Sequence, residues 1–211
     1  MVLSQRQTAI SDKPQKLKGE GRLRQVSDGN EGFARFLNPH AVDRHLSQSC
    51  NFFPNMNTEC HRIADQLRRA FQGQAWHGPS LRELLTNVNA EQANARPVKS
   101  AHSIWELVLH IDIWAKAALE SLAGVPLPKL YGTEKDWPPV ADSSAGAWQA
   151  ATDRMFRTAT ELAQAIEGFA DERLTDVVPS RQYDFYYLFH GVVQHSLYHG
   201  GQIAIVKKAL A

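Results

Sequence analysis

Hydrophobic residues after Met56 recur at the spacing of three and four residues that is typical of amphipathic α-helices. The first such segment spans residues 58–72, where polar residues separate a set of apolar ones, Ile63, Leu67, Ala70 and Phe71. Two later segments, residues 103–123 and 184–208, are largely apolar, as expected of helices inside a bundle. Strand-like alternation is absent from the sequence. The pattern therefore predicts an all-α fold.

Capping residues and helix breakers give the limits of these elements. The segments Ser80–Glu83 and Ser103–Glu106 have the capping-box pattern, in which the Ser hydroxyl accepts from the third amide and the Glu carboxylate returns to the cap. Asp142 or Ser143 is expected to cap a further helix, which Gly168 ends. The predicted helices cover residues 58–72, 80–88, 103–123, 142–167 and 184–208.

The four substantial helices are joined by one long Pro-containing connection, residues 124–141. This arrangement is typical of a four-helix bundle with a crossover, which we expect over residues 56–211. Residues 1–55 are polar with isolated apolar patches, so we expect a mostly disordered tail. We hypothesise that Met56 is the natural start and that the tail is an over-extended reading frame.

The composition excludes several classes of protein. Among 211 residues, Lys and Arg number 23 and Asp and Glu 22, a net charge of +1, so nothing predicts general attraction to nucleic acid or to an anionic membrane. Two cysteines cannot form a disulfide scaffold or a four-Cys zinc site. No apolar run of about 18 residues and no signal-peptide core is present. We therefore expect a cytoplasmic protein with neither nucleic acid nor membrane as partner.

Three of the nine histidines are candidate metal ligands. His195 and His199 are four residues apart, which places both imidazoles on one helix face at a spacing that can hold one metal ion. His110 lies on an apolar helix, where it is either a hydrogen-bonded core residue or a third ligand. Three neutral nitrogens with an open fourth position form the usual catalytic pattern. Such ligands suit Zn, Ni, Fe or Co without selecting among them.

The segments Leu107–His110 and His195–Ile203 resemble the motifs of the DinB/YfiT-like superfamily, and the resemblance extends over residues 56–211. It implies a four-helix bundle that binds a divalent metal through His110, His195 and His199. Gln202 matches a Gln that recurs after the last ligand. Gly200 stands where many relatives carry a basic residue, which weakens any inference of an anionic substrate.

The resemblance leaves the activity open. It implies an enzyme that transfers a low-molecular-weight thiol to small electrophiles, or a hydrolase that uses a metal-bound water. A third alternative is a bundle that binds metal or forms a homodimer without catalysis. A small-molecule substrate is expected in the first two cases. Either a thiol or a water bound to an open metal would become a better nucleophile at neutral pH.

Further residues have two interpretations each. Glu106 could orient His110, although a role in the capping box is favoured. Gln202 could be an auxiliary residue that hydrogen-bonds a ligand or the metal-bound water, or it could pack at the helix surface. His190 points about 140° away from His195 on an α-helix, and we expect it in the core or behind the ligands. A group of aromatic residues could line a cleft or belong to the core: Trp105, Trp114, Tyr131, Trp137 and Tyr198.

Three further histidines are expected to have roles other than metal binding. We expect His102 at the entry of a helix and His61 in solvent. Trp76 and His77 lie in a loop that could border the site, although packing is favoured.

Overall fold

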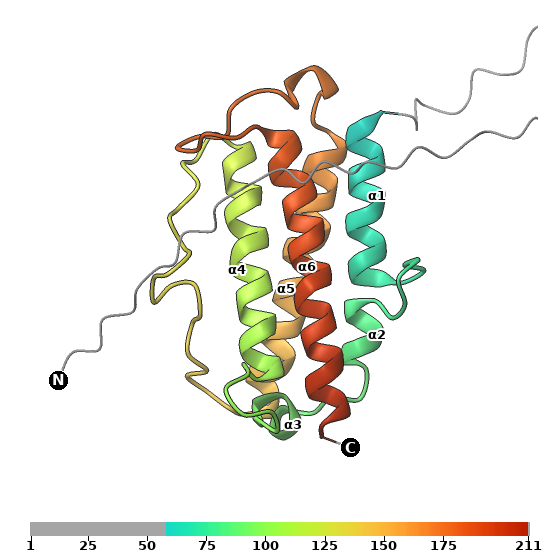
Figure 1. Cartoon of the computed structure of the whole chain (residues 1–211), viewed down its shortest axis with the longest axis vertical. Coiled ribbons are helices and arrows are strands. Elements are labelled where there is room, and N and C mark those ends of the chain that lie inside the picture. Colours follow the sequence, from blue (N-terminus) through green and yellow to red (C-terminus); the bar gives the residue numbers. More distant parts are fainter. Residues whose placement is uncertain (1–57, 211) are drawn as a thin grey trace, which may run out of the picture. The chain divides into compact units, whose positions relative to one another are not determined.

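The computed structural model describes residues 58–210, in which four long helices lie side by side (Figure 1). No extended strand is present in this part of the chain, so the expectation of an all-α bundle is confirmed. The elements in order are α1 (Glu59–Gln72), α2 (Leu81–Leu85), α3 (Ala90–Asn94), α4 (Ile104–Leu122), α5 (Ala145–Glu167), the 3₁₀ helix η1 (Asp171–Arg173) and α6 (Phe185–Lys208).

Most helix starts follow the predicted caps. Ser80 and Ser103 each form the complete capping box with the Glu three residues later. The predicted cap of α5 is wrong: Ser144, not Asp142 or Ser143, accepts the hydrogen bond from the amide of Ala147. Asp142 instead accepts from the amide of Ser144 at 2.8 Å, and so supports the turn that leads into the cap.

The helix predicted over residues 80–88 is α2, which ends early at Leu85, and α3 over Ala90–Asn94 is a further helix that was not predicted. The break comes where Asn87 adopts a positive φ of 61°, a conformation that Asn tolerates better than most residues. Asn89 then starts α3 with a second kind of capping box, in which Gln92 takes the place of Glu. A turn therefore ends the predicted helix early, and a new cap begins an additional one.

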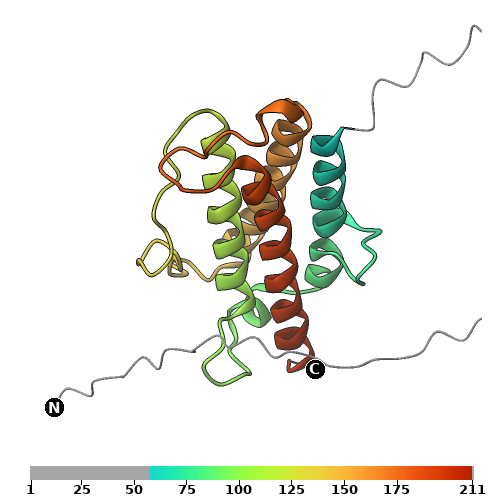
Figure 2. The ribbon, with the colours of Figure 1, turned by 45° about the horizontal axis from the view of Figure 1, so that its top comes forward.

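The long connection between α4 and α5 determines the topology. It runs along the outer side of α4 and brings the chain back to the end from which α4 began (Figures 1 and 2). As a result α4 and α5 point in the same direction, whereas α1 and α6 run the opposite way. The predicted bundle with one crossover is confirmed, and residues of the crossover lie beside α4.

The core is formed where α4 and α5 pack on each other and on α1 and α6. Its largest fully buried side chains come from all four helices and include Phe71, Leu107, Met155, Phe189 and Ile203. One buried carboxylate joins two helices: Asp112 of α4 accepts from Arg154 and Thr158 of α5 at 2.7 and 2.8 Å. The buried charge is therefore paired and hydrogen-bonded, as burial requires.

The predicted tail of residues 1–55 and the proposed start at Met56 lie outside the described residues, so both stay predictions. Between residues 58 and 210, none of the helices combines the length and the apolar character needed to cross a membrane.

Candidate metal centre

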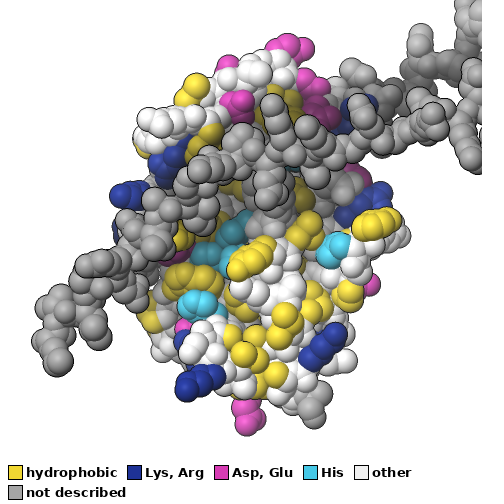
Figure 3. Space-filling view, viewed as in Figure 1, with side chains coloured by type: hydrophobic (Ala, Val, Ile, Leu, Met, Phe, Trp, Pro, Cys, Tyr) yellow, Lys and Arg dark blue, Asp and Glu magenta, His cyan; other side chains and the backbone are white. Residues whose placement is uncertain are grey.

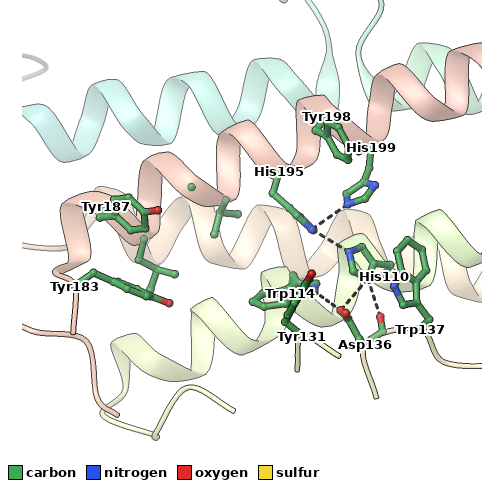
Figure 4. A pocket seen from close by; sticks show the side chains of 13 residues that line it. His110, Trp114, Tyr131, Asp136, Trp137, Tyr183, Tyr187, His195, Tyr198 and His199 are labelled. Carbon is green, nitrogen blue, oxygen red and sulfur yellow. Dashed lines mark hydrogen bonds and ion pairs between the residues drawn. The ribbon is translucent and has the colours of Figure 1, made fainter. Parts of the chain in front are cut away.

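The three candidate ligands come together between α4 and α6 (Figure 4). His195 and His199 project from successive turns of α6, and His110 faces them from α4. The Nε2 atom of His195 is 3.0 Å from that of His110 and 3.1 Å from that of His199. Sequence positions some 85 residues apart thus meet at one point, as predicted.

The donor set fits a divalent cation. All three ligand atoms lie within 4.8 Å of one another. Nitrogens that bind zinc at about 2.0–2.1 Å in tetrahedral geometry lie roughly 3.3 Å apart, close to the two spacings found here. Imidazole nitrogen suits zinc, nickel and iron alike, so the residues define the site without choosing the metal.

Hydrogen bonds on the far side of two rings determine which nitrogen is free. The Nδ1–H of His110 donates to the backbone carbonyl of Asp136 at 2.7 Å, and that of His199 donates to Oε1 of Gln202 at 2.7 Å. Because a carbonyl oxygen only accepts, each Nδ1 must carry the proton and each Nε2 keeps its lone pair. Such outer hydrogen bonds are the usual way in which proteins orient metal-binding histidines.

Burial keeps the three imidazoles neutral. It lowers the pKa of His195 to about 3, with the neighbouring His199 and His110 adding to the effect. Burial is also the main cause of the lowered pKa values of His110 and His199, which the hydrogen bonds to Asp136 and Gln202 partly oppose. Neutral imidazole is the form that binds metal, so the site is prepared for a cation at physiological pH.

The crossover covers His110 with an indole ring. Trp137 stacks on His110 at 3.8 Å between ring centroids and on His102 at 3.5 Å on its other face. The carboxylate of the preceding residue, Asp136, accepts from Nε1 of Trp114 at 2.8 Å and lies 3.3 Å from Nδ1 of His110. Two adjacent crossover residues therefore hold the same ligand by stacking and by hydrogen bonding.

A pocket of about 450 Å³ opens beside the three histidines. In Figure 3, histidine side chains are visible on this face of the molecule among hydrophobic ones. Four of the five aromatic residues considered for a cleft line the pocket, namely Trp114, Tyr131, Trp137 and Tyr198. Trp105 belongs to the core instead and packs on Trp148 with 5.2 Å between ring centroids.

Two polar candidates have definite roles. Glu106 completes the capping box of α4 and forms an ion pair with Arg96, so it supports the helix and Asp136 orients His110 in its place. Gln202 accepts a hydrogen bond from His199, so it contacts a candidate ligand rather than packing only at the helix surface.

Of the other histidines between residues 58 and 210, none lines the pocket, and one expectation about the loop is wrong. His190 faces α1, with Nε2 3.7 Å from Glu59, rather than the back of the ligands. His61 is half-buried and hydrogen-bonds Thr58 at 2.6 Å, so it is less solvated than expected. Trp76 is fully exposed and His77 is exposed, which contradicts the packing favoured for this loop.

Sequence reasoning missed Asp136, Tyr183 and Tyr187. Asp136 lies in a connection without periodicity, where neither position nor spacing indicates which residue faces a ligand. Tyr187 lies on α6 two helical turns before His195, whereas Tyr183 lies in the loop before the helix. The repeat of four residues that identified the histidine pair therefore extends backward to Tyr187, and that signal was available in the sequence.

Comparison with known proteins identifies the family. Neither the curated proteins nor the solved structures gave a match to this chain. The family model described as DinB superfamily matches residues 75–203, which is more than half of the chain and includes all three histidines. On this match, together with the helical bundle and its three converging imidazoles, the chain belongs to the DinB superfamily.

Proposed function

We propose that this protein is a metal-dependent enzyme that transfers a low-molecular-weight thiol to a small electrophile. The proposal depends on one observation: three imidazole nitrogens meet at the edge of a pocket to which the described residues contribute no free carboxylate. His110, His195 and His199 would hold zinc, nickel or iron. A divalent cation in such a site lowers the pKa of a thiol or water at its open position and thereby supplies a nucleophile at neutral pH.

The environment of Asp136 favours a thiol over water as the nucleophile. Zinc hydrolases of the peptidase type place a carboxylate as general base beside the attacking water. Among the described residues, Asp136 is the only carboxylate that lines this pocket; it is 4% exposed and already bonded to Trp114 and His110. A free thiol has a pKa near 8.5, far below the pKa of bulk water, and so needs far less help to lose its proton.

Residues around the site orient the metal ligands and shield them from water. Asp136 and Gln202 orient two ligands, and Trp137 covers one face of His110. His110 and His199 are each only 5% exposed, so little water surrounds these ligands, which strengthens electrostatic interactions there. The reaction itself forms a bond from the thiol sulfur to the electrophile as a leaving group departs with the electron pair, and the thiol proton passes to solvent.

The test compares two reactions in the purified full chain. With zinc, nickel or iron(II) added, the protein should accelerate conjugation of cysteine or 2-mercaptoethanol to 1-chloro-2,4-dinitrobenzene, followed by absorbance and chloride release. Hydrolysis of 4-nitrophenyl acetate without thiol should stay at the background rate. Ester hydrolysis without conjugation would instead establish the hydrolase alternative.

A variant links the activity to the site. We expect His199→Ala to lower the metal-dependent rate at least about 100-fold, because it removes one of the three ligands and leaves Gln202 without its partner. The circular dichroism spectrum should remain unchanged. His77→Ala is the matched control, since His77 is an exposed loop histidine outside the site. Less than about half an equivalent of metal after supplementation of the unmodified protein would support a bundle without catalysis.

A further inference from the structure

Aromatic rings form most of the pocket beside the three histidines. They come from the crossover, from α4, and from α6 with the loop before it; the rings belong to Trp114, Tyr131, Trp137, Tyr183, Tyr187 and Tyr198. Leu188 and Val192 add aliphatic surface between them. Aromatic and aliphatic lining with few polar groups is typical of sites for small organic ligands, and about 450 Å³ falls in their size range.

The pocket offers no partner for a charged ligand group away from the histidines. Within residues 58–210, no Lys or Arg lines it, and Asp136 is committed to Trp114 and His110. The phenol hydroxyls of the tyrosines offer hydrogen bonds but no opposite charge. A charged group moved from water into such surroundings would therefore lose hydration without gaining a charged partner. The part of a ligand that lies against the rings is therefore neutral.

One face of α6 shows where that part lies. Tyr187, Gly191, His195 and His199 follow one another at intervals of four residues, and all four line the pocket. In Figure 4 Tyr183 and Tyr187 lie at one end of the pocket and the histidines at the other. Gly191 is the position between them, and a Cβ atom added there would meet nothing within 4 Å.

A missing side chain at this position leaves a recess. Residues four apart on a helix lie one turn, about 5.4 Å, from each other along its axis. The space that a side chain at residue 191 would fill is thus bounded by Tyr187 on one side and by His195 on the other. A flat ring placed there would contact the tyrosine and reach the histidines with its edge.

We propose that Gly191 is a specificity-determining residue, and that the recess above it binds the neutral aromatic portion of a substrate with the reactive atom toward the three histidines. The inference rests on the proposed function for the identity of the ligand as a substrate. It goes further in naming the chemical class, an uncharged molecule with one or two aromatic rings, and the residue that admits it.

The test is a binding measurement on the full chain, as purified and again after chelation of metal. The probe is N-phenyl-1-naphthylamine, a neutral dye whose emission rises in apolar surroundings. We expect saturable binding in both forms, with displacement by 2-naphthalenemethanol. We expect the anion 2-naphthoate to displace the dye at least tenfold less effectively from the chelated form.

Two leucine variants on the same helix decide the role of Gly191. Gly191→Leu should weaken dye binding at least tenfold because its side chain fills the recess. Gly201→Leu is the matched control, because Gly201 also lies on α6 with nothing within 4 Å of an added Cβ, but it is outside the pocket. Gly191→Ala, which adds one methyl group, should bind with an intermediate affinity and serves if the leucine variant fails to fold.

Equal binding by the Gly191→Leu and Gly201→Leu proteins would overturn the inference, as would displacement by naphthoate equal to that by the alcohol. Because the chelated protein is measured, the result does not depend on thiol transfer. Binding that depends on residue 191 without any conjugation activity would reject the proposed function and keep the recess. Equal conjugation rates in the Gly191→Leu and Gly201→Leu proteins would keep the proposed function and reject the recess as a substrate site.

Discussion

Asp136 and Gln202 determine the protonation of two imidazoles from outside the ligand set. Each provides a carbonyl oxygen 2.7 Å from an Nδ1 atom, so each directs the Nε2 lone pair toward the centre of the site. Neither residue needs to touch a metal to affect how strongly the site holds one. Their contributions are therefore separable by substitution from those of the ligands.

We expect His110→Ala to abolish tight metal binding and Gln202→Leu to raise the dissociation constant about 10- to 100-fold. The first change removes a ligand, whereas the second removes only the acceptor that orients His199. Competition against a chromophoric zinc chelator measures both. Gln202→Glu, which keeps an acceptor oxygen, is the control and should bind at least as tightly as the unmodified protein. An unchanged affinity in His110→Ala would exclude that residue as a ligand.

The sequence indicated the ligands because helical spacing is regular. His195 and His199 share a helix face because they are four residues apart, and His110 was identified from its apolar helix and its match to the family motif. The same reasoning could not indicate Asp136, because a connection rich in Pro has no period and its residues are positioned only by tertiary packing against α4. Trp137 and Tyr131 were identified as aromatic candidates, but only their place beside the pocket separates them from Trp105 in the core.

At the level of helices, the caps of α4 and α5 differ in how much they contribute. Ser103 is 1% exposed and shares a reciprocal pair of hydrogen bonds with Glu106. Ser144 is exposed and only accepts, from the amide of Ala147. A buried amide that loses its acceptor has no water to replace it, so the cap of α4 is the more sensitive one.

Substitution of the two serines should show this difference. We expect Ser103→Ala to lower the free energy of unfolding by about 1–2 kcal/mol and Ser144→Ala by about 0.5 kcal/mol, the two ends of the range for lost N-caps. Urea unfolding followed by circular dichroism gives both values. Equal losses of unfolding free energy would mean that burial of the capping box of Ser103 and Glu106 adds no stability.

Helix limits were predictable where a cap and a breaker agree, as for α1, α4 and α6. They were not predictable between residues 80 and 100, because a positive φ at Asn87 and a cap at Asn89 are local choices that the hydrophobic pattern does not record. The start of α5 shifted for a related reason. Asp142, Ser143 and Ser144 are all good caps, and the structure uses the last of them.

For the molecule as a whole, the buried histidines make the metal-free protein sensitive to acid. The pKa of His195 is lowered to about 3 and those of His110 and His199 are lowered as well. Below an ordinary value near 6.5 the unfolded chain binds protons that the folded chain does not, so stability falls as pH falls. Each such group contributes at most about 1.4 kcal/mol per pH unit.

We therefore expect the free energy of unfolding of the chelated protein to decrease steadily between pH 7 and pH 5. His195→Gln should flatten that decrease, since it removes the imidazole with the lowest pKa. Urea unfolding at intervals of half a pH unit measures this free energy. The range stops at pH 5 because Asp171, whose pKa is lowered by the amides of Cys60 and Glu59, is protonated only under more acidic conditions. A pH-independent stability over this range would contradict the burial of neutral rings.

The crossover from α4 to α5 contributes Asp136 and Trp137 to the centre but none of the three ligands. A cut in its exposed stretch around residues 132–135 would leave every coordinating atom in the chain and both halves of the bundle packed together. It would free the carbonyl and the indole that hold His110. The loss of bound metal during limited proteolysis would therefore follow the cleavage of the crossover.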